Sequence, residues 1–174
     1  MKRTVWIWEL FGFATVSLGG TVLHFLYEWL GKPKWIAVFS GVNESTFEHM
    51  KLLFWPMLVY AIAESFFFRS YGSFICIKLR GILLGLILIP IIFYTYNGVI
   101  GRSPDWINIA IFFISAGAAF VYETRALTRD TVRLRSKTLA IATLFILGVA
   151  FAVFTFRTPR LEIFRDPVTS SYGI

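Results

Sequence analysis

The stretch that decides the fold reads Asn43-Glu44-Ser45-Thr46-Phe47-Glu48-His49-Met50-Lys51, and it leads straight into an apolar run from Leu52 to Ala63. Hydrocarbon is an expensive place for charge, so ionisable side chains at the start of a membrane helix indicate a functional site. If the stretch is helical, Glu44, Glu48 and Lys51 fall within about 60° of one another. Ser45 and His49 form a second column beside them, one turn apart. The stretch therefore predicts a membrane helix with carboxylates, an ammonium, an imidazole and a hydroxyl on one half of its surface.

The same residues also have a purely structural interpretation. Ser45-x-x-Glu48 is a capping box, Asn43 is a good N-cap residue, and acidic side chains in a first turn favour the helix dipole. Capping explains neither His49 nor Lys51. Both interpretations, a capped helix start and a polar site, therefore stay open.

The composition places this helix in a membrane protein. The chain has 174 residues, of which 57% are hydrophobic, and its mean hydropathy of +0.69 is too high for a soluble domain of this size. Residues 81–101, 106–122 and 138–156 contain no Asp, Glu, Lys or Arg. A helix needs about 20 residues to cross the hydrocarbon. The sequence therefore predicts an all-α, polytopic transmembrane bundle at residues 1–158, with about five spans at 6–30, 44–68, 76–98, 104–124 and 138–157, followed by a short ordered tail at 159–174.

The net charge of +7 reflects membrane topology rather than nucleic-acid binding. With five spans and the N-terminus inside, the inner segments carry ten Lys and Arg residues and the outer segments carry six. Basic residues gather in the cytoplasmic loops of membrane proteins. We therefore expect the C-terminus outside, the lipid bilayer as a partner and no nucleic-acid partner. Cys76 is the only cysteine, which excludes an intramolecular disulfide and a thiolate metal site.

Under this topology, polar residues from several segments gather in the outer half of the bundle. The first helix carries a stripe in which Glu9, Thr21, Tyr27 and Glu28 lie within about 60° of His24. Buried polar groups cost free energy unless they satisfy one another or a ligand. The predicted network or ligand-binding residues are His24, Tyr27, Glu28, Asn43, Glu44, Ser45, Glu48, His49, Lys51, Tyr94, Tyr96 and Asp166.

Two further expectations concern the ends of the bundle. Glu9, Glu64 and Glu123 form a second set toward the inner side, where Arg69 in a basic loop is the expected partner of Glu64. At the outer end, residues 159–174 either fold back over the bundle as a lid or fray as a free terminus.

Several motifs together resemble one bacterial family of small polytopic membrane proteins, catalogued only as a domain of unknown function. These motifs are His24-Phe25-x-Tyr27-x-Trp29, Asn43-Glu44-Ser45-x-x-Glu48-His49-x-Lys51-Leu52, Phe93-Tyr94-x-Tyr96-x-Gly98, and a tail with Phe164-x-Asp166-Pro167 and Tyr172-Gly173-Ile174. The resemblance implies a multi-pass protein of the bacterial cytoplasmic (inner) membrane whose tail belongs to the structure. It implies no activity.

A fainter likeness is to the alkaline-ceramidase-like membrane hydrolases. These enzymes hold a zinc ion with several His plus Asp and Ser inside a helical bundle. The present chain has Ser45 and two histidines, but it lacks a third His and a His-x-x-x-His pair.

Three functions are compatible with the predicted outer cluster. The one that the sequence favours is binding and movement of an ion or small polar solute, in which His24, Glu44, Glu48 and His49 titrate. A chain this short would then need to work as a homo-oligomer.

The two alternatives give the same residues other roles. In a metal-dependent hydrolase acting on a lipid or amphiphile, His24, His49 and either Glu48 or Glu44 would bind one divalent metal such as Zn²⁺ and leave a position open for water. In a non-catalytic binding or assembly subunit, the cluster would be a satisfied network that fixes the helix register, with a carboxylate neutralising Lys51. Sequence alone does not decide whether the two histidines meet.

Overall fold

Helices account for most of the residues that the computed structural model describes, which are 2–68, 72–101, 104–129 and 136–174. The five long helices are α1 (Lys2–Trp29), α3 (Thr46–Ser65), α4 (Phe74–Val99), α5 (Asp105–Arg129) and α6 (Lys137–Phe156), and they overlap the five expected segments. A four-residue helix, α2 (Lys34–Ala37), follows α1, and a 3-10 turn, η1 (Glu162–Phe164), lies in the tail. The predicted all-α fold class is therefore confirmed.

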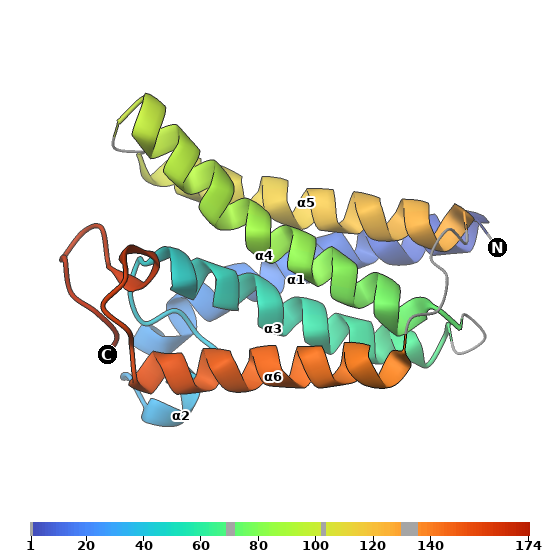
Figure 1. Ribbon diagram of the computed structural model, residues 1–174, viewed down its shortest axis with the longest axis horizontal. Coiled ribbons are helices and arrows are strands. Elements are labelled where there is room, and N and C mark those ends of the chain that lie inside the picture. The colour runs from blue at the N-terminus through green and yellow to red at the C-terminus, as the bar shows by residue number, and fades with distance from the viewer. Residues whose placement is uncertain (1, 69–71, 102–103, 130–135) are drawn as a thin grey trace.

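The five long helices run side by side along the long axis of the molecule (Figure 1). α3 is central: it contacts α1 and α4 extensively, while α5 packs against both α4 and α1. α6 completes the bundle against α4 and α3. The N-terminus lies at one end, which we call the N-terminal end, and α2 and the C-terminal tail lie at the opposite end, which we call the tail end (Figure 1).

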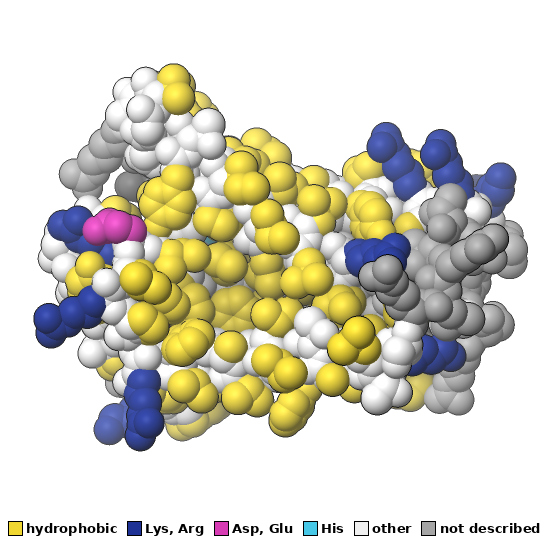
Figure 2. Space-filling model, in the orientation of Figure 1, with side chains coloured by type: hydrophobic (Ala, Val, Ile, Leu, Met, Phe, Trp, Pro, Cys, Tyr) yellow, Lys and Arg dark blue, Asp and Glu magenta, His cyan; other side chains and the backbone are white. Residues whose placement is uncertain are grey.

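Four of the described helices are long and apolar enough to cross a membrane: Lys2–Trp29, Phe74–Val99, Trp106–Arg129 and Lys137–Phe156. Figure 2 shows hydrophobic side chains across the middle of the visible face, with lysines and arginines toward both ends. This distribution suits a bundle whose middle contacts hydrocarbon and whose ends contact water. The number of spans and their orientation remain predictions.

α3 is not among these four helices, and it carries three charged residues, Glu48, Lys51 and Glu64. Its central position buries all three side chains completely or almost completely. Neighbouring helices therefore shield these charges, which a lipid-facing helix could not keep.

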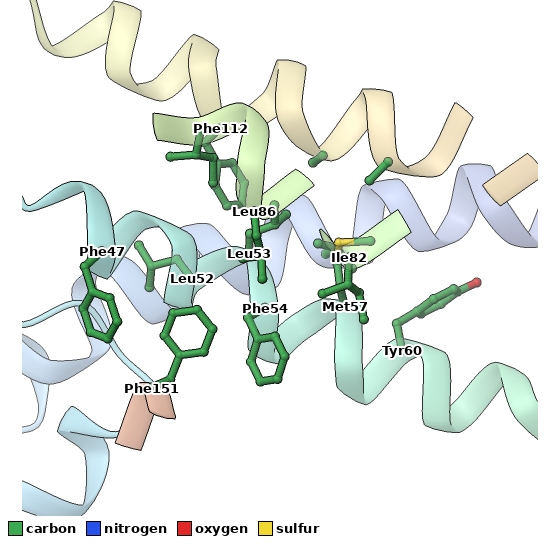
Figure 3. Packing of buried hydrophobic residues seen from close by; sticks show 14 of the residues in the cluster. Phe47, Leu52, Leu53, Phe54, Met57, Tyr60, Ile82, Leu86, Phe112 and Phe151 are labelled. Carbon is green, nitrogen blue, oxygen red and sulfur yellow. The ribbon is translucent and has the colours of Figure 1, made fainter. Parts of the chain in front are cut away.

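Apolar side chains around α3 form the main core, as Figure 3 shows. Leu53 of α3 and Ile82 of α4 are fully buried in it. On the other side, a Cβ atom added to Gly20 of α1 would lie only 3.1 Å from the Leu52 carbonyl oxygen. Gly20 thus permits a close approach of the α1 and α3 backbones. Because His24 follows Gly20 by one turn on the same face of α1, this approach carries it toward the start of α3.

Candidate functional site

The N-cap of α3 decides where the polar side chains of the opening stretch point. Ser45 is the N-cap residue: its Oγ accepts a hydrogen bond from the Glu48 amide at 3.4 Å, and its own amide donates to Asn43 Oδ1 at 2.9 Å. The helix therefore begins at Thr46, and Glu44 lies before it. The expected stripe through Glu44 and Glu48 required a helix that already included residue 44. In the structure the carboxylates of Glu44 and Glu48 instead contact different partners.

Glu44 lies between two histidines from different helices. Its Oε1 is 3.6 Å from His24 Nε2 of α1, and its Oε2 is 3.7 Å from His49 Nε2 of α3. The two imidazole ring centroids are 5.8 Å apart, and one ligand atom from each of the three side chains lies within 4.8 Å of the others. We call His24, Glu44 and His49 the His–Glu triad. The structure thus brings together the two histidines whose meeting the sequence left undecided.

A backbone hydrogen bond fixes the tautomer of His49. Its Nδ1 lies 3.0 Å from the Ser45 carbonyl oxygen, which can only accept, so Nδ1 carries the proton and donates it. In the neutral imidazole the free lone pair is then on Nε2, the atom that faces Glu44. A carbonyl acceptor at the far ring nitrogen is the usual support of a metal-ligating histidine.

The side chains of the triad lie farther apart than hydrogen-bonded partners, with their ligand atoms gathered around one point. A charge-assisted N–H···O bond is about 2.7–2.9 Å long, whereas the two nitrogen–oxygen distances here are 3.6 and 3.7 Å. Ligand atoms about 2.1 Å from a tetrahedral zinc ion lie about 3.4 Å from one another, so the triad, whose ligand atoms lie within 4.8 Å, would have to close around an ion by a small movement of its side chains. Two imidazole nitrogens and one carboxylate oxygen also form the donor set of a known class of catalytic zinc site, which keeps its fourth position open.

The triad lies in the wall of a cavity of about 410 Å³ at the tail end of the bundle. The cavity has more apolar than polar wall, as small-molecule sites typically have. Beside the triad, its polar wall residues are Thr21, Asn97 and Asn108, and its apolar or small ones are Gly20, Phe25, Leu52, Phe93, Ile109, Phe112, Phe113, Pro167 and Val168.

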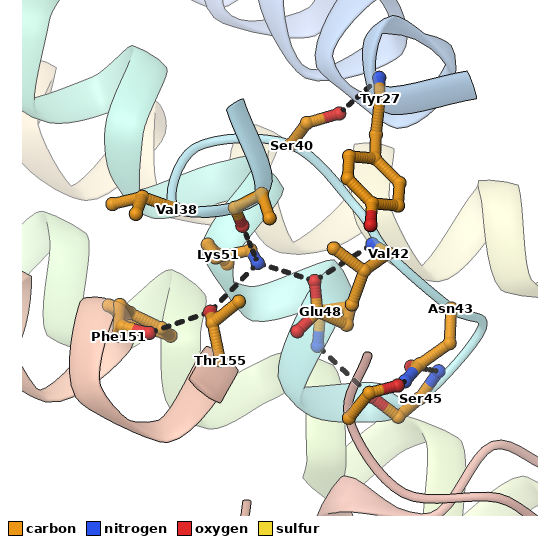
Figure 4. A network of polar contacts seen from close by, with 12 residues as sticks. Tyr27, Val38, Ser40, Val42, Asn43, Ser45, Glu48, Lys51, Phe151 and Thr155 are labelled. Carbon is orange, nitrogen blue, oxygen red and sulfur yellow. Dashed lines mark hydrogen bonds and ion pairs between the residues drawn. The ribbon is translucent and has the colours of Figure 1, made fainter. Parts of the chain in front are cut away.

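Glu48 belongs to a separate buried network, shown in Figure 4. Its Oε2 lies 2.5 Å from Lys51 Nζ and accepts a hydrogen bond from the Val42 amide at 3.1 Å. Lys51 also donates to the Ala37 carbonyl oxygen at 2.7 Å and to Thr155 Oγ1 at 3.1 Å. The network joins α3 to α2, to the segment that follows α2, and to α6. Lys51 neutralises Glu48, so the carboxylate that meets the histidines is Glu44 and not the alternative ligand Glu48.

The C-terminal tail is ordered and covers the tail end. The buried Asp166 carboxylate accepts hydrogen bonds from the turn that follows it. Asn43 Nδ2 donates to the Gly173 carbonyl oxygen at 3.1 Å, and the Phe164 and Phe47 ring centroids are 4.5 Å apart. Of the two expectations for the tail, the structure therefore shows the folded one, in which the tail supplies part of the cavity wall.

Four other residues of the predicted set are not cavity wall residues. Glu28 is exposed and lies 3.0 Å from Lys32, whose pKa this carboxylate raises above its ordinary value. Tyr27 packs in a small apolar cluster with α2. Tyr94 and Tyr96 lie near the end of α4, outside the cavity wall.

The inner set of glutamates surrounds Lys78, which the sequence analysis counted only as one of the ten basic residues of the inner segments. Lys78 Nζ of α4 lies 2.7 Å from Glu9 Oε1, 2.5 Å from Glu64 Oε2 and 2.7 Å from Glu123 Oε2. We call these four residues the Lys78 cluster. The expected partner of Glu64, Arg69, lies outside the described residues, and the partner that the structure shows is Lys78. Three glutamates at the same end of three helices indicate a common basic partner. The sequence analysis did not identify that partner as Lys78.

Comparison with known proteins identifies a family but no activity. No curated protein and no solved structure matches the chain. No relative therefore supports the fainter likeness to alkaline-ceramidase-like hydrolases. The sequence profile described as a family of unknown function, DUF6512, matches residues 2–174. The match confirms the predicted resemblance to a family without an assigned activity, and the chain therefore belongs to the DUF6512 family.

Proposed function

We propose that this protein is a metal-dependent hydrolase of the membrane, which binds one divalent cation such as Zn²⁺ through His24, Glu44 and His49. The observation that carries the proposal is the convergence of their three ligand atoms within 4.8 Å at the wall of a 410 Å³ cavity. Bound there, the cation would supply an activated water and polarise a substrate carbonyl. The residues of the chain would hold the ion, keep its open position toward the cavity and bind the substrate.

The walls of the cavity favour an amphiphilic substrate. Phe25 of α1 and Ile109 and Phe113 of α5 are exposed on the apolar surface as well as lining the cavity. An acyl chain could therefore lie against them while its polar group meets the triad and the nearby Asn97 and Asn108. In hydrolysis of an acyl ester, water oxygen bonds to the carbonyl carbon, the bond to the leaving oxygen breaks, and that oxygen takes a proton.

The distribution of basic residues supports an orientation with the N-terminal end inside. With the Lys- and Arg-rich N-terminal end inside, the His–Glu triad faces the outer leaflet. We therefore propose a lipid or lipid-like amphiphile of the outer leaflet of a bacterial cytoplasmic membrane as the substrate class.

Solute transport, which the sequence favoured, becomes the second candidate. Along α3, between His49 of the triad and Glu64 of the Lys78 cluster, lie tightly buried apolar side chains, among them Leu53, Phe54 and Met57. A polar solute would have to displace them, and as a transporter the short chain would need a homo-oligomer. A satisfied structural network, the third candidate, describes Glu48 and Lys51 well, but it gives no role to the cavity beside the triad.

The test is metal-dependent cleavage by the purified protein in lipid nanodiscs. The probes are a chromogenic long-chain acyl ester, its acetyl counterpart, a long-chain N-acyl amide and a phospholipid. We expect cleavage of a long-chain probe that requires Zn²⁺, stops with a chelator, and is lost in Glu44→Gln but kept in the matched control Glu28→Gln. Metal binding without cleavage of any probe would overturn the hydrolase assignment while leaving the metal site. Absence of metal binding would overturn both.

A further inference from the structure

The Lys78 cluster is the most highly charged buried group in the described part of the chain. Glu9 comes from α1, Glu64 from α3 and Glu123 from α5, and each lies within 2.7 Å of the single Lys78 ammonium of α4. All four side chains are at most 2% exposed. The cluster therefore joins four helices through one point that water does not reach.

The charges of this cluster do not balance if every carboxyl group is ionised. Three negative charges would then face one positive charge, which leaves two uncompensated negative charges at a buried site. Isolated buried charge costs so much free energy that such groups take up protons instead. The Glu48–Lys51 pair is a natural comparison, because there one carboxylate faces one ammonium and the charges balance.

Among the described residues, neighbouring groups do not supply the missing positive charge. Within the described residues, the ion pairs of the three glutamates all run to Lys78. Tyr60 of α3 faces the cluster, with Lys78 Nζ 5.9 Å from its ring centroid, but its hydroxyl donates to the Trp8 carbonyl oxygen. The other ionisable residues of the packed helices at this end are the buried Cys76, the half-buried Tyr122, and the exposed Lys2, Arg3, Arg80, Arg125, Arg129 and Lys137.

Unpartnered oxygen atoms show where the balancing protons belong. Glu9 Oε2, Glu64 Oε1 and Glu123 Oε1 are buried and have no hydrogen-bond partner in the described structure. A protonated carboxyl group has an O–H that can donate to the carboxylate beside it. Two protons would remove the excess charge and give these oxygens hydrogen-bonding partners at the same time.

We propose that the Lys78 cluster is a buried proton-binding site that holds two protons on its three carboxyl groups. The third carboxyl group is ionised and pairs with Lys78. The site is separate from the His–Glu triad, since Glu9 and His24 are fifteen residues apart on α1, about 22 Å along the helix axis. The proposal of a proton-binding site therefore does not depend on the proposal of a metal centre.

The test is infrared spectroscopy of the full chain in nanodiscs at neutral pH, because carboxylic acids have a C=O stretching band that carboxylates lack. The band is recorded for the wild type, for each of Glu9→Gln, Glu64→Gln and Glu123→Gln, and for Glu64→Gln combined with Glu123→Gln. We expect the cluster to contribute two carboxylic acids in the wild type, one in any single variant and none in the double variant. The number falls whichever residue is replaced, because the remaining protons redistribute until one carboxylate faces Lys78.

Two controls establish that the band comes from the cluster and that the variants are folded. Glu28→Gln, which alters an exposed carboxylate, should leave the band unchanged. Glutamine has the shape of a protonated glutamate, so the single variants of the cluster should fold and keep an unfolding midpoint near that of the wild type. Glu48→Gln should instead have a lower unfolding midpoint. A band that the cluster variants leave unchanged would overturn the proposal, as would failure of all three single variants to fold. A stabilising requirement for Na⁺ or K⁺ without the band would assign the site to a metal cation instead.

Discussion

Replacing Glu48 by glutamine should destabilise the protein strongly, although the substitution changes almost no volume. The Lys51 ammonium is fully buried, and Glu48 is its only carboxylate partner among the described residues. In the variant, Lys51 keeps the Ala37 carbonyl and Thr155 Oγ1 as neutral acceptors, but its charge is uncompensated. Breaking one side of a buried ion pair typically costs about 3–5 kcal/mol. We expect the free energy of unfolding to fall by that amount. Water does not screen this ion pair, because neither side chain is more than 3% exposed.

The assay is reversible unfolding in mixed micelles, and a second substitution sharpens it. Adding Lys51→Met to Glu48→Gln removes the unpaired charge and leaves chiefly the Ala37 carbonyl oxygen without its donor, since Thr155 still donates to Phe151. An unsatisfied buried acceptor costs about 1–3 kcal/mol, so the double variant should be more stable than Glu48→Gln alone. A loss below about 1 kcal/mol for Glu48→Gln, or a double variant less stable than the single one, would refute this account of the network.

Two further predictions concern the two polar clusters. Zinc affinity should fall as the pH is lowered, because protons compete with the metal ion for its ligand atoms; calorimetric titration measures it. Gly81→Ala should lower the free energy of unfolding by about 1–3 kcal/mol, because its Cβ would collide with the Glu123 carboxyl group. Gly98→Ala, with open space around it, should be neutral or slightly stabilising in the same unfolding assay.

The sequence predicted the helices well because their signal is local. Long charge-free runs indicate membrane helices by length and composition alone, and α4, α5 and α6 overlap such runs. The all-α fold class therefore needed no knowledge of which helix contacts which. The central position of α3 was harder to predict from the sequence. Its charged residues show that it cannot face lipid, but they do not show which helices surround it.

The site was predicted in its residue types but not in its pairing. A helical wheel assigns Glu44 and Glu48 to one stripe, and only the N-cap at Ser45 shows that they diverge. The meeting of His24 with His49 depends on the close approach of two backbones at Gly20, which is a tertiary contact. No local pattern predicts such a contact. Asn108, an amide within an apolar helix, was a usable signal of the cavity wall that the sequence analysis passed over.

The role of Lys78 was missed for a related reason. It follows the start of α4 by only four residues, so a sequence window places it at the edge of a loop with other basic residues. On the same helix, the absence of a Cβ at Gly81 leaves room for the side chain of Glu123, which pairs with Lys78. The three glutamates that surround it come from three other helices, and only the packed bundle shows them as one group.

Elemental analysis of protein purified without a chelator or a polyhistidine tag tests the central claim most directly. The account predicts roughly one zinc or other divalent transition-metal ion per chain, lost in both His24→Ala and His49→Ala and retained in Glu28→Gln. A metal-free wild-type protein that also fails to bind added Zn²⁺, or a metal content that the two histidine variants leave unchanged, would contradict it.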